Sequence, residues 1–186
     1  MSQKFPELLP EHIHFIQAQQ MFFTGTAGTE GKVNVSPKGI DSLRVMNAGR
    51  VLWLNLTGSG NETAAHVLEN ARMTLMFCSF DTQPLILRLY GKARVVHPID
   101  SGWKELSSHF PAHPGARQIF DLAIDLVQTS CGFAVPRYEF IGQRDTLLKW
   151  AEGRGEEGIR QYWQDHNRLS LDGKKTGIEG DGEFTG

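Results

Sequence analysis

Short runs rich in β-branched and aromatic residues recur along residues 21–141, and most of them stop at a cluster of glycine, proline, asparagine or aspartate. Runs bounded in this way by turn residues are typical of β-strands. They cover residues 21–27, 32–36, 51–56, 72–80 and 85–96, with a last strand or pair of strands at 130–141. The pattern predicts a mainly β protein, a six-stranded antiparallel barrel with appended helices.

Apolar residues at helical spacing flank these strands. They predict helices at 10–20, 61–70 and 101–110, and two more after residue 146 that are separated by the glycines of 151–158. Residues 1–150 are expected to form the barrel domain. Residues 151–186 add a C-terminal helix and a glycine-rich tail, which belong to the same domain or pack on a partner subunit. We expect the tail at 168–186 to be disordered or held by a partner surface.

The longest strand-like run, at 85–96, contains an arginine and a glycine in unusual positions. Gly91 predicts a bulge or bend, which a barrel needs in order to close. Side chains alternate across a strand, so Arg88 shares one face with Ile86 and Tyr90. An arginine that interrupts an apolar surface either pairs with a carboxylate or holds a ligand, and the sequence leaves both possibilities open.

Composition and charge exclude several classes of function. The 19 lysines and arginines against 21 acidic residues give a net charge of −2, so the chain lacks the positive charge that attracts nucleic acid. No apolar run approaches the roughly 20 residues needed to cross a bilayer, and the N-terminus lacks the apolar region of a signal peptide. We therefore expect a cytoplasmic protein with neither a nucleic-acid nor a membrane partner.

The two cysteines and one pair of histidines are further candidates for a reactive or metal-binding site. Cys78 and Cys131 both lie in apolar strand-like runs, which favours small buried thiols over a disulfide or a nucleophile. His109 and His113 have the spacing of a metal pair on a helix. Pro111 and Pro114 make a regular helix there improbable, so we expect a polar loop and no metal site.

Two polar corners are candidates for binding an anion. The first is Ser36-Pro37-Lys38-Gly39, in which the proline and the glycine shape the backbone that presents Lys38. The second is residues 57–63, a glycine-containing loop that opens into a helix capped by Ser59 or Asn61 and offers free backbone N–H groups. Each has a simpler interpretation, as a solvated turn lysine or as an ordinary capped helix. Glu62 would lie close to any phosphate bound there.

The order of these motifs resembles a known family. The segments are Val35-Ser36-Pro37-Lys38-Gly39, Gly60-Asn61-Glu62-Thr63-Ala64-Ala65, Glu69-Asn70-Ala71-Arg72 and Arg88-Leu89-Tyr90-Gly91-Lys92-Ala93. Over roughly residues 21–97 they resemble the pyridoxamine 5′-phosphate oxidase-related family of FMN-binding split barrels. The later helices and Ser170-Leu171-Asp172-Gly173 resemble an uncharacterised subgroup of that family.

The resemblance implies a homodimer with FMN in clefts between the subunits. It places residues 33–38 along the flavin and ribityl chain, residues 61–63 at the phosphate, and Arg88 across the dimer. The implied cofactor-binding residues are Val35, Ser36, Pro37, Lys38, Gly39, Leu56, Thr57, Asn61, Glu62, Thr63 and Arg88. No catalytic residue is implied.

Departures from the family pattern bear on the substrate. Oxidases that act on pyridoxamine phosphate carry basic side chains where this chain has Glu62 and Thr63, and a polar residue where it has Ile86. Their C-terminal arginine motif is also not recognisable. The prediction is therefore an FMN-dependent oxidoreductase that acts on a small molecule other than pyridoxamine phosphate, in which Lys38 or Arg88 stabilises the anionic reduced flavin.

Two alternatives remain open from the sequence. One is a non-catalytic protein that binds flavin or haem on the same barrel, with His66, His97 or His109 as an axial haem ligand. The other is a deazaflavin-dependent reductase, which the family also contains.

Overall fold

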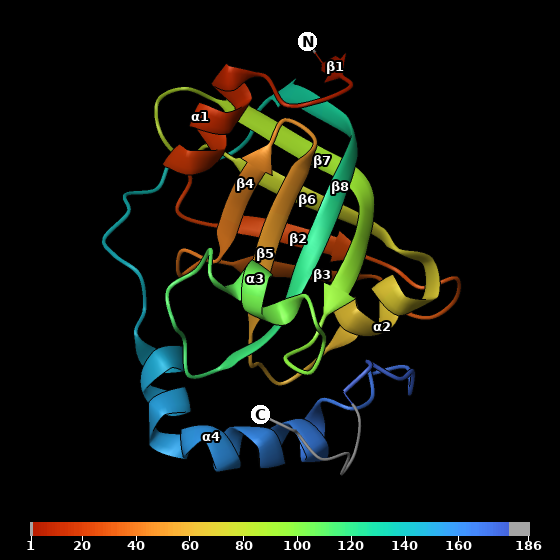
Figure 1. The fold of residues 1–186 in the computed structure, drawn as a ribbon. Helices are drawn as coiled ribbons and strands as arrows, with labels where there is room; N and C mark the ends of the chain where they lie inside the picture. Colours follow the sequence, from red (N-terminus) through yellow and green to blue (C-terminus); the bar gives the residue numbers. More distant parts are fainter. Residues whose placement is uncertain (1, 179–186) are drawn as a thin grey trace.

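The computed structural model describes residues 2–178 and contains one curved antiparallel sheet with four helices around it (Figure 1). The strands are β1 (Gln3–Phe5), β2 (Phe22–Thr26), β3 (Asn34–Lys38), β4 (Leu43–Asn47), β5 (Arg50–Leu56), β6 (Arg72–Cys78), β7 (Leu85–Val96) and β8 (Ala116–Cys131). The helices are α1 (Pro10–Ala18), α2 (Glu62–Asn70), α3 (Trp103–Ser107) and α4 (Thr146–His166). This confirms the mainly β prediction.

The strand order explains the split in the barrel. The sheet runs β3-β2-β6-β7-β8-β5-β4, and β1 pairs with β8 outside this path. Every neighbouring pair is antiparallel. The two ends of the order, β3 and β4, follow each other in the chain and do not pair in this order, so the curved sheet is open between them. The core inside is built around Trp53, Phe77 and Phe120, and the rings of Trp53 and Phe120 stack at 4.7 Å.

Strand β7 was predicted with its correct bounds and bulge. Its register with β8 shifts between Tyr90 and Gly91, where a Cβ atom would collide with the carbonyl group of Ala123. Leu87 and Leu89 are fully buried on the inner face. Alternation along the strand therefore places Arg88 and Tyr90 on the outer face, as the sequence indicates.

The sheet has two more strands than predicted. β1 is only three residues long, and β4 lies within the segment 39–49 that the sequence presents as a loop. β4 pairs with β5 through Leu43 and Trp53, Arg44 and Leu52, and Val45 and Val51. A strand this short is stabilised by its neighbour more than by its own composition, so its local sequence carries little signal.

The predictions for β3 and for the last strand were wrong at their ends. β3 continues through Pro37 to Lys38 instead of stopping at Ser36. It is an edge strand, where a missing N–H group is tolerated because one side has no partner strand. The last strand is residues 116–131 rather than 130–141, because β8 gains its partners from β5 and β7 along that length.

The helices largely follow the predictions. α1 begins at Pro10 as expected, whereas α3 is shorter than predicted and starts after Gly102 instead of a Ser101 cap. α4 consists of two helical parts joined at Gly155, whose φ of 66° breaks the helical backbone. None of the helices within residues 2–178 is long and apolar enough to cross a membrane.

Two further expectations need correction. Cys78 is buried as predicted, but Cys131 is exposed at the end of β8. Residues 168–178 are ordered and fold back on the barrel of their own chain, and Thr176 there is completely buried; a partner surface for them stays a prediction. The remainder of the predicted tail, residues 179–186, lies outside the described residues.

Candidate functional site

The two polar corners meet at one pocket of about 370 Å³, which we call the basic pocket. It lies between β3, the end of β5, the start of α2 and the start of β8. Its lining residues are Asn34, Ser36, Lys38, Trp53, Asn55, Leu56, Gly58, Ser59, Gly60, Asn61, Glu62, Thr63 and Arg117. Pockets that bind small ligands span roughly 300 to 1,000 Å³, so this volume is large enough for part of a cofactor.

One face of β3 forms a wall of this pocket. Asn34, Ser36 and Lys38 alternate along the strand and all line it. Ser36 shares a hydrogen bond with Thr24 on β2 at 3.1 Å, and the Asn34 side chain donates to the Thr63 hydroxyl group at 3.1 Å. These contacts fix the wall against both the sheet and α2.

Lys38 carries a positive charge into the pocket in a largely desolvated position. Its ammonium group lies 5.1 Å from the centre of the Trp53 ring, which provides a cation–π contact. Burial, together with the nearby charge of Arg117, lowers the pKa of Lys38 to about 8. An anion bound beside this lysine would favour its charged form and raise the pKa again.

Arg117 supplies the second positive charge, and the sequence analysis missed it. The side chain is only 2% exposed, and its Nη1 donates to the Asn167 side-chain oxygen at 2.7 Å and the Gly58 carbonyl oxygen at 3.3 Å. Within residues 2–178 its Nε has no hydrogen-bond partner, and the guanidinium forms no ion pair. Burial lowers the pKa of Arg117 to about 10, so the side chain remains charged at neutral pH.

A β-bulge accounts for the position of Arg117. Asn55 pairs with Gln118 and Leu56 pairs with Ala116, which leaves Arg117 as the extra residue between them. Bulges turn a side chain away from the regular alternation of a strand and are frequent beside active sites. The sequence does show a charged residue just ahead of the apolar Ile119 and Phe120. Because the last strand was predicted at residues 130–141, Arg117 fell outside it.

The start of α2 faces the same pocket. Asn61 occupies the N-cap position, but its side chain makes no capping bond and instead contacts Gln118 and the Asn167 carbonyl oxygen. The first N–H groups of the nine-residue helix therefore have no side-chain cap, and the positive end of its dipole is next to Lys38 and Arg117. The Glu62 carboxylate accepts a hydrogen bond from the Leu171 backbone at 2.8 Å.

Other residues of the predicted cofactor site lie outside the basic pocket. Val35 and Pro37 are exposed on the opposite face of β3. Thr57 is buried, donates to the Gly115 carbonyl oxygen at 2.9 Å and accepts from the Trp163 indole at 2.8 Å. Arg88 is not among the lining residues, and it donates to the Ser130 hydroxyl group at 3.2 Å rather than to a carboxylate. A cofactor contact for these residues stays a prediction.

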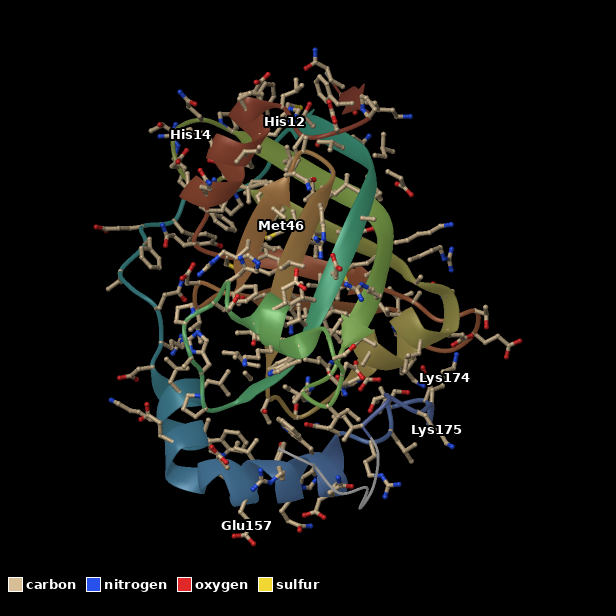
Figure 2. The ribbon with its side chains drawn as sticks, in the orientation of Figure 1. His12, His14, Met46, Glu157, Lys174 and Lys175 are labelled. Atoms are coloured by element: carbon tan, nitrogen blue, oxygen red, sulfur yellow. The ribbon has the colours of Figure 1, made fainter. Side chains whose placement is uncertain are left out.

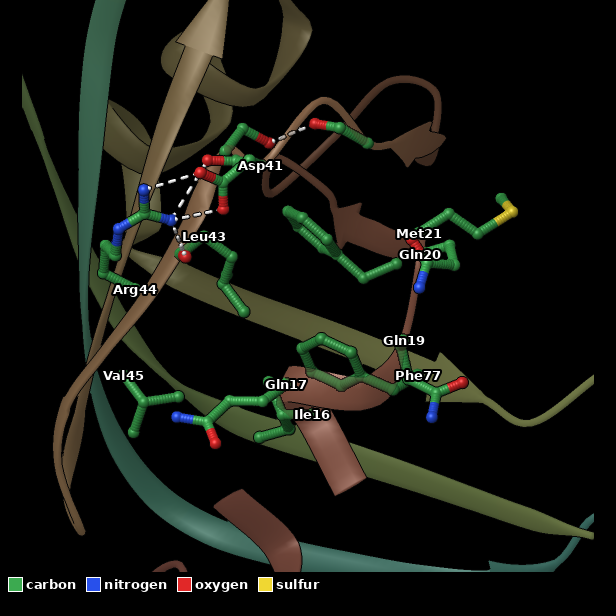
Figure 3. Close-up of a pocket in the computed structure, with 13 residues that line it drawn as sticks. Ile16, Gln17, Gln19, Gln20, Met21, Asp41, Leu43, Arg44, Val45 and Phe77 are labelled. Atoms are coloured by element: carbon green, nitrogen blue, oxygen red, sulfur yellow. Dashed lines mark hydrogen bonds and ion pairs between the residues drawn. The ribbon is translucent and has the colours of Figure 1, made fainter. Parts of the chain in front are cut away.

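Gly39 lines a second pocket, of about 280 Å³, between α1 and the start of β4 (Figure 3). Asp41 and Arg44 form a two-pronged ion pair in its wall, with distances of 2.7 and 2.8 Å. The Arg44 guanidinium also lies 5.0 Å from the Phe110 ring centre. Ile40 and Asp41 have φ angles of 58° and 47°, a strained conformation for residues other than glycine. The charge of this pocket is thus internally neutralised.

The histidines considered as haem ligands lie away from both pockets. His66 is 1% exposed, and its Nδ1 shares a hydrogen bond with the Thr26 hydroxyl group at 3.0 Å. The His97 backbone donates to Asp100, and His109 is at the end of α3, where its carbonyl oxygen accepts from Arg44. Among residues 2–178, no group of three potential metal-ligating side chains is close enough to hold a metal ion.

The sheet defines a split-barrel protein, and the basic pocket lies beside β3, at the open side of the barrel. The chain belongs to the pyridoxamine 5′-phosphate oxidase family, whose model matches residues 8–131. Pyridoxamine 5′-phosphate oxidase family protein ustO of Aspergillus flavus is 37% identical over 175 residues, which cover 83% of this chain and 70% of that protein.

Solved structures agree with this fold. HupZ from group A Streptococcus superposes with a TM-score of 0.54 at 15% identity, covering 66% of this chain and 98% of the other. A candidate pyridoxamine 5′-phosphate oxidase from Lactobacillus delbrueckii has a TM-score of 0.52 at 18% identity, covering 66% and 94%. At such low identity these structures show the fold alone.

Proposed function

We propose that this protein binds FMN and uses it in an oxidoreductase reaction on a small molecule, with the FMN phosphate in the basic pocket. The observation that carries the proposal is a pair of cations in one pocket, the buried Arg117 and the half-buried Lys38. A buried charge without a partner is costly. A phosphate group would provide both cations with the opposite charge that the described residues do not supply as an ion pair.

The donors in the pocket suit a phosphate monoester. Arg117 would bind it through its guanidinium and Lys38 through its ammonium group, while Ser36 and the first N–H groups of α2 would supply neutral donors. Asn34 and Ser36 would orient the ribityl chain along β3. When bound, FMN supplies a hydride acceptor and donor.

Pyridoxamine phosphate is not the substrate that we propose. The family residues that are basic at the phosphate segment are Glu62 and Thr63 here, and Arg117 from β8 supplies charge from the other side. The two cations are thus committed to one phosphate group, that of the cofactor. We propose that the substrate is a small molecule that needs no second phosphate site.

A homodimer is part of the same proposal. β3 is an open edge of the sheet, and Val33 and Val35 on its outer face are 71% and 65% exposed. Phe133 and Ile141, in the irregular segment after β8, are also largely exposed at 82% and 97%. These exposed apolar side chains favour a second subunit that covers them.

The test is a cofactor titration of the purified full-length protein. FMN, riboflavin, a deazaflavin and haem are each added, and binding is measured by calorimetry and by visible absorbance. We expect FMN to bind with a flavin spectrum, and riboflavin, which lacks the phosphate, to bind at least about tenfold more weakly. Absence of both flavin absorbance and thermal stabilisation by FMN would overturn the proposal, and a Soret band or preferential deazaflavin binding would support the corresponding alternative.

A further inference from the structure

Residues 167–178, which we call the C-terminal segment, turn back from α4 and lie along the barrel beside α2 (Figure 1). The segment forms a small loop of its own, in which Leu169 bridges to Lys175. Figure 2 shows Lys174 close to α2. The segment is therefore a neighbour of the basic pocket, although it is far from β3 and β5 in the sequence.

Asn167 connects the segment to the buried arginine. Its side-chain oxygen accepts from Arg117 at 2.7 Å, and its side-chain nitrogen donates to the Gly58 carbonyl oxygen at 3.0 Å. Its backbone oxygen accepts from the side chains of Asn61 and Thr176 at 3.3 and 2.6 Å. Asn167 is completely buried, so it fixes the direction of the guanidinium relative to the glycine-containing loop at residues 57–63.

Leu171 connects the segment to Glu62. Glu62 is the one carboxylate among the residues that line the basic pocket, and its Oε2 accepts the Leu171 N–H at 2.8 Å. Its negative charge favours the charged form of Arg117 and so raises the pKa of that side chain, against the larger effect of burial. Without the bond to Leu171, the carboxylate would be free to turn toward Arg117 and neutralise the charge that an anion needs.

Ion pairs with two other parts of the barrel hold the segment in place. Asp172 accepts from both the backbone and the side chain of Lys32, at 2.8 and 2.7 Å. Lys174 pairs with Glu69 and donates to the Glu30 carbonyl oxygen at 2.9 Å. Partly exposed pairs of this kind are individually weak, so removing them loosens residues 171–175 while Asn167 and Thr176 keep their buried contacts.

We propose that the C-terminal segment sets the anion affinity of the basic pocket, because Asn167 orients Arg117 and the Leu171 N–H holds the Glu62 carboxylate away from the anion. The inference rests on the proposed function and deepens it. Asn167 and Glu62 are positioning residues, and neither needs to touch the cofactor. By linkage, an anion in the pocket stabilises the docked segment to the same degree that the docked segment strengthens anion binding.

A double-mutant cycle tests the role of Glu62. Asp172→Ala with Lys174→Ala loosens the segment, and Glu62→Gln removes the competing charge. The dissociation constants of FMN and of inorganic phosphate are measured by calorimetry. We expect the Asp172→Ala/Lys174→Ala protein to bind both ligands about tenfold more weakly than the unmodified protein. Adding Glu62→Gln to that protein should recover most of the lost affinity. In the otherwise unmodified protein, Glu62→Gln should change affinity by no more than about threefold.

The matched control removes an exposed ion pair of α4, Glu156→Ala with Arg160→Ala, which deletes one acidic and one basic residue in the same way. We expect it to leave both affinities unchanged. The inference would be overturned if Asp172→Ala with Lys174→Ala lowered ligand affinity equally in the presence and absence of Glu62→Gln. It would also be overturned if the α4 control lowered ligand affinity by the same amount.

Hydrogen exchange gives a readout that needs no flavin. We expect inorganic phosphate to increase protection of the backbone amides of residues 168–178, and Glu62→Ala to remove the protection of the Leu171 amide. If FMN does not bind but phosphate protects the segment, the proposed function fails and this inference stands. If FMN binds while protection of the segment does not change and the cycle is additive, this inference fails and the proposed function stands.

Discussion

Arg44 and Arg117 each line a pocket, and their surroundings are opposite. Arg44 has a carboxylate of its own in Asp41 and the ring of Phe110 beneath it, and its side chain is 27% exposed. Arg117 is 2% exposed and has no ion pair among residues 2–178. The same residue type is therefore part of the scaffold in one pocket and available for a ligand in the other.

The difference shows which buried charge to examine first. A neutralised guanidinium holds a loop together, here the strained corner at Ile40 and Asp41. A buried guanidinium without a carboxylate destabilises the ligand-free fold. Under the proposed function, the phosphate of FMN supplies the missing negative charge. Four measurements test this difference between Arg44 and Arg117.

The largest effect is expected for Arg117→Met, which removes the buried charge but keeps much of the volume. FMN affinity should fall by about 3 kcal/mol, roughly a hundredfold, because charged hydrogen bonds to the phosphate are lost. Calorimetry with FMN and riboflavin measures it, and riboflavin affinity should change far less. Arg44→Met is the matched control: it should lower the free energy of unfolding by about 0.5 to 1 kcal/mol and leave FMN affinity in place. Similar losses of FMN affinity in both variants would refute the contrast.

Lys38→Ala should weaken FMN binding by about 1 to 3 kcal/mol through loss of a charge-assisted hydrogen bond. Lys38→Arg, which keeps the charge, should retain most of the affinity. The dissociation constants of the two variants are compared by fluorescence quenching of the flavin. Unchanged affinity in the alanine variant would place the phosphate elsewhere.

The pH dependence of binding should report the same lysine. With a pKa of about 8 in the ligand-free protein, Lys38 loses its charge as the pH rises through that value, and FMN affinity should then fall by up to about tenfold per pH unit. Lys38→Met should abolish this slope. Because the pKa is below the ordinary value of 10.5, the unfolded chain binds more protons between these limits, and the ligand-free protein should become more stable as the pH rises across them. A flat affinity profile from pH 7 to 9.5 would contradict the assignment.

The smallest effect on phosphate affinity is expected for Arg88→Ala, because Arg88 contacts Ser130 outside the basic pocket. The expected change in FMN affinity is less than about threefold. The variant should instead alter the kinetics of flavin reduction or the stability of the dimer, measured by anaerobic stopped flow and sedimentation. A normal dimer with normal kinetics would leave Arg88 as a surface arginine.

The features that were predicted correctly from the sequence are those that depend on residues close together in the chain. The apolar alternation of β7 and the glycine at its bulge are visible in the residues themselves. The two polar corners were recognised because glycine, proline and helix starts have their own chemistry. That they meet in one pocket followed from the family resemblance and is seen in the structure.

The features that were missed depend on partners far along the chain. β4 and the early start of β8 are set by pairing with β5 and β7. Arg117 reaches the pocket through a bulge against β5 and is held by Asn167, which lies 50 positions later. The sequence indicated that Glu62 would lie close to a bound phosphate, but not which group binds the Glu62 carboxylate. That group is the backbone N–H of Leu171, which the residue types do not reveal.

Asn167 also has a consequence for the order of events during synthesis. The last strand of the barrel ends at Cys131, and Asn167, which accepts a hydrogen bond from Arg117, is translated 36 codons after it. All strands of the sheet are therefore synthesised before this partner of Arg117. Under the proposed function, the sheet can form before the anion-binding pocket is complete, and FMN would bind after the barrel has folded.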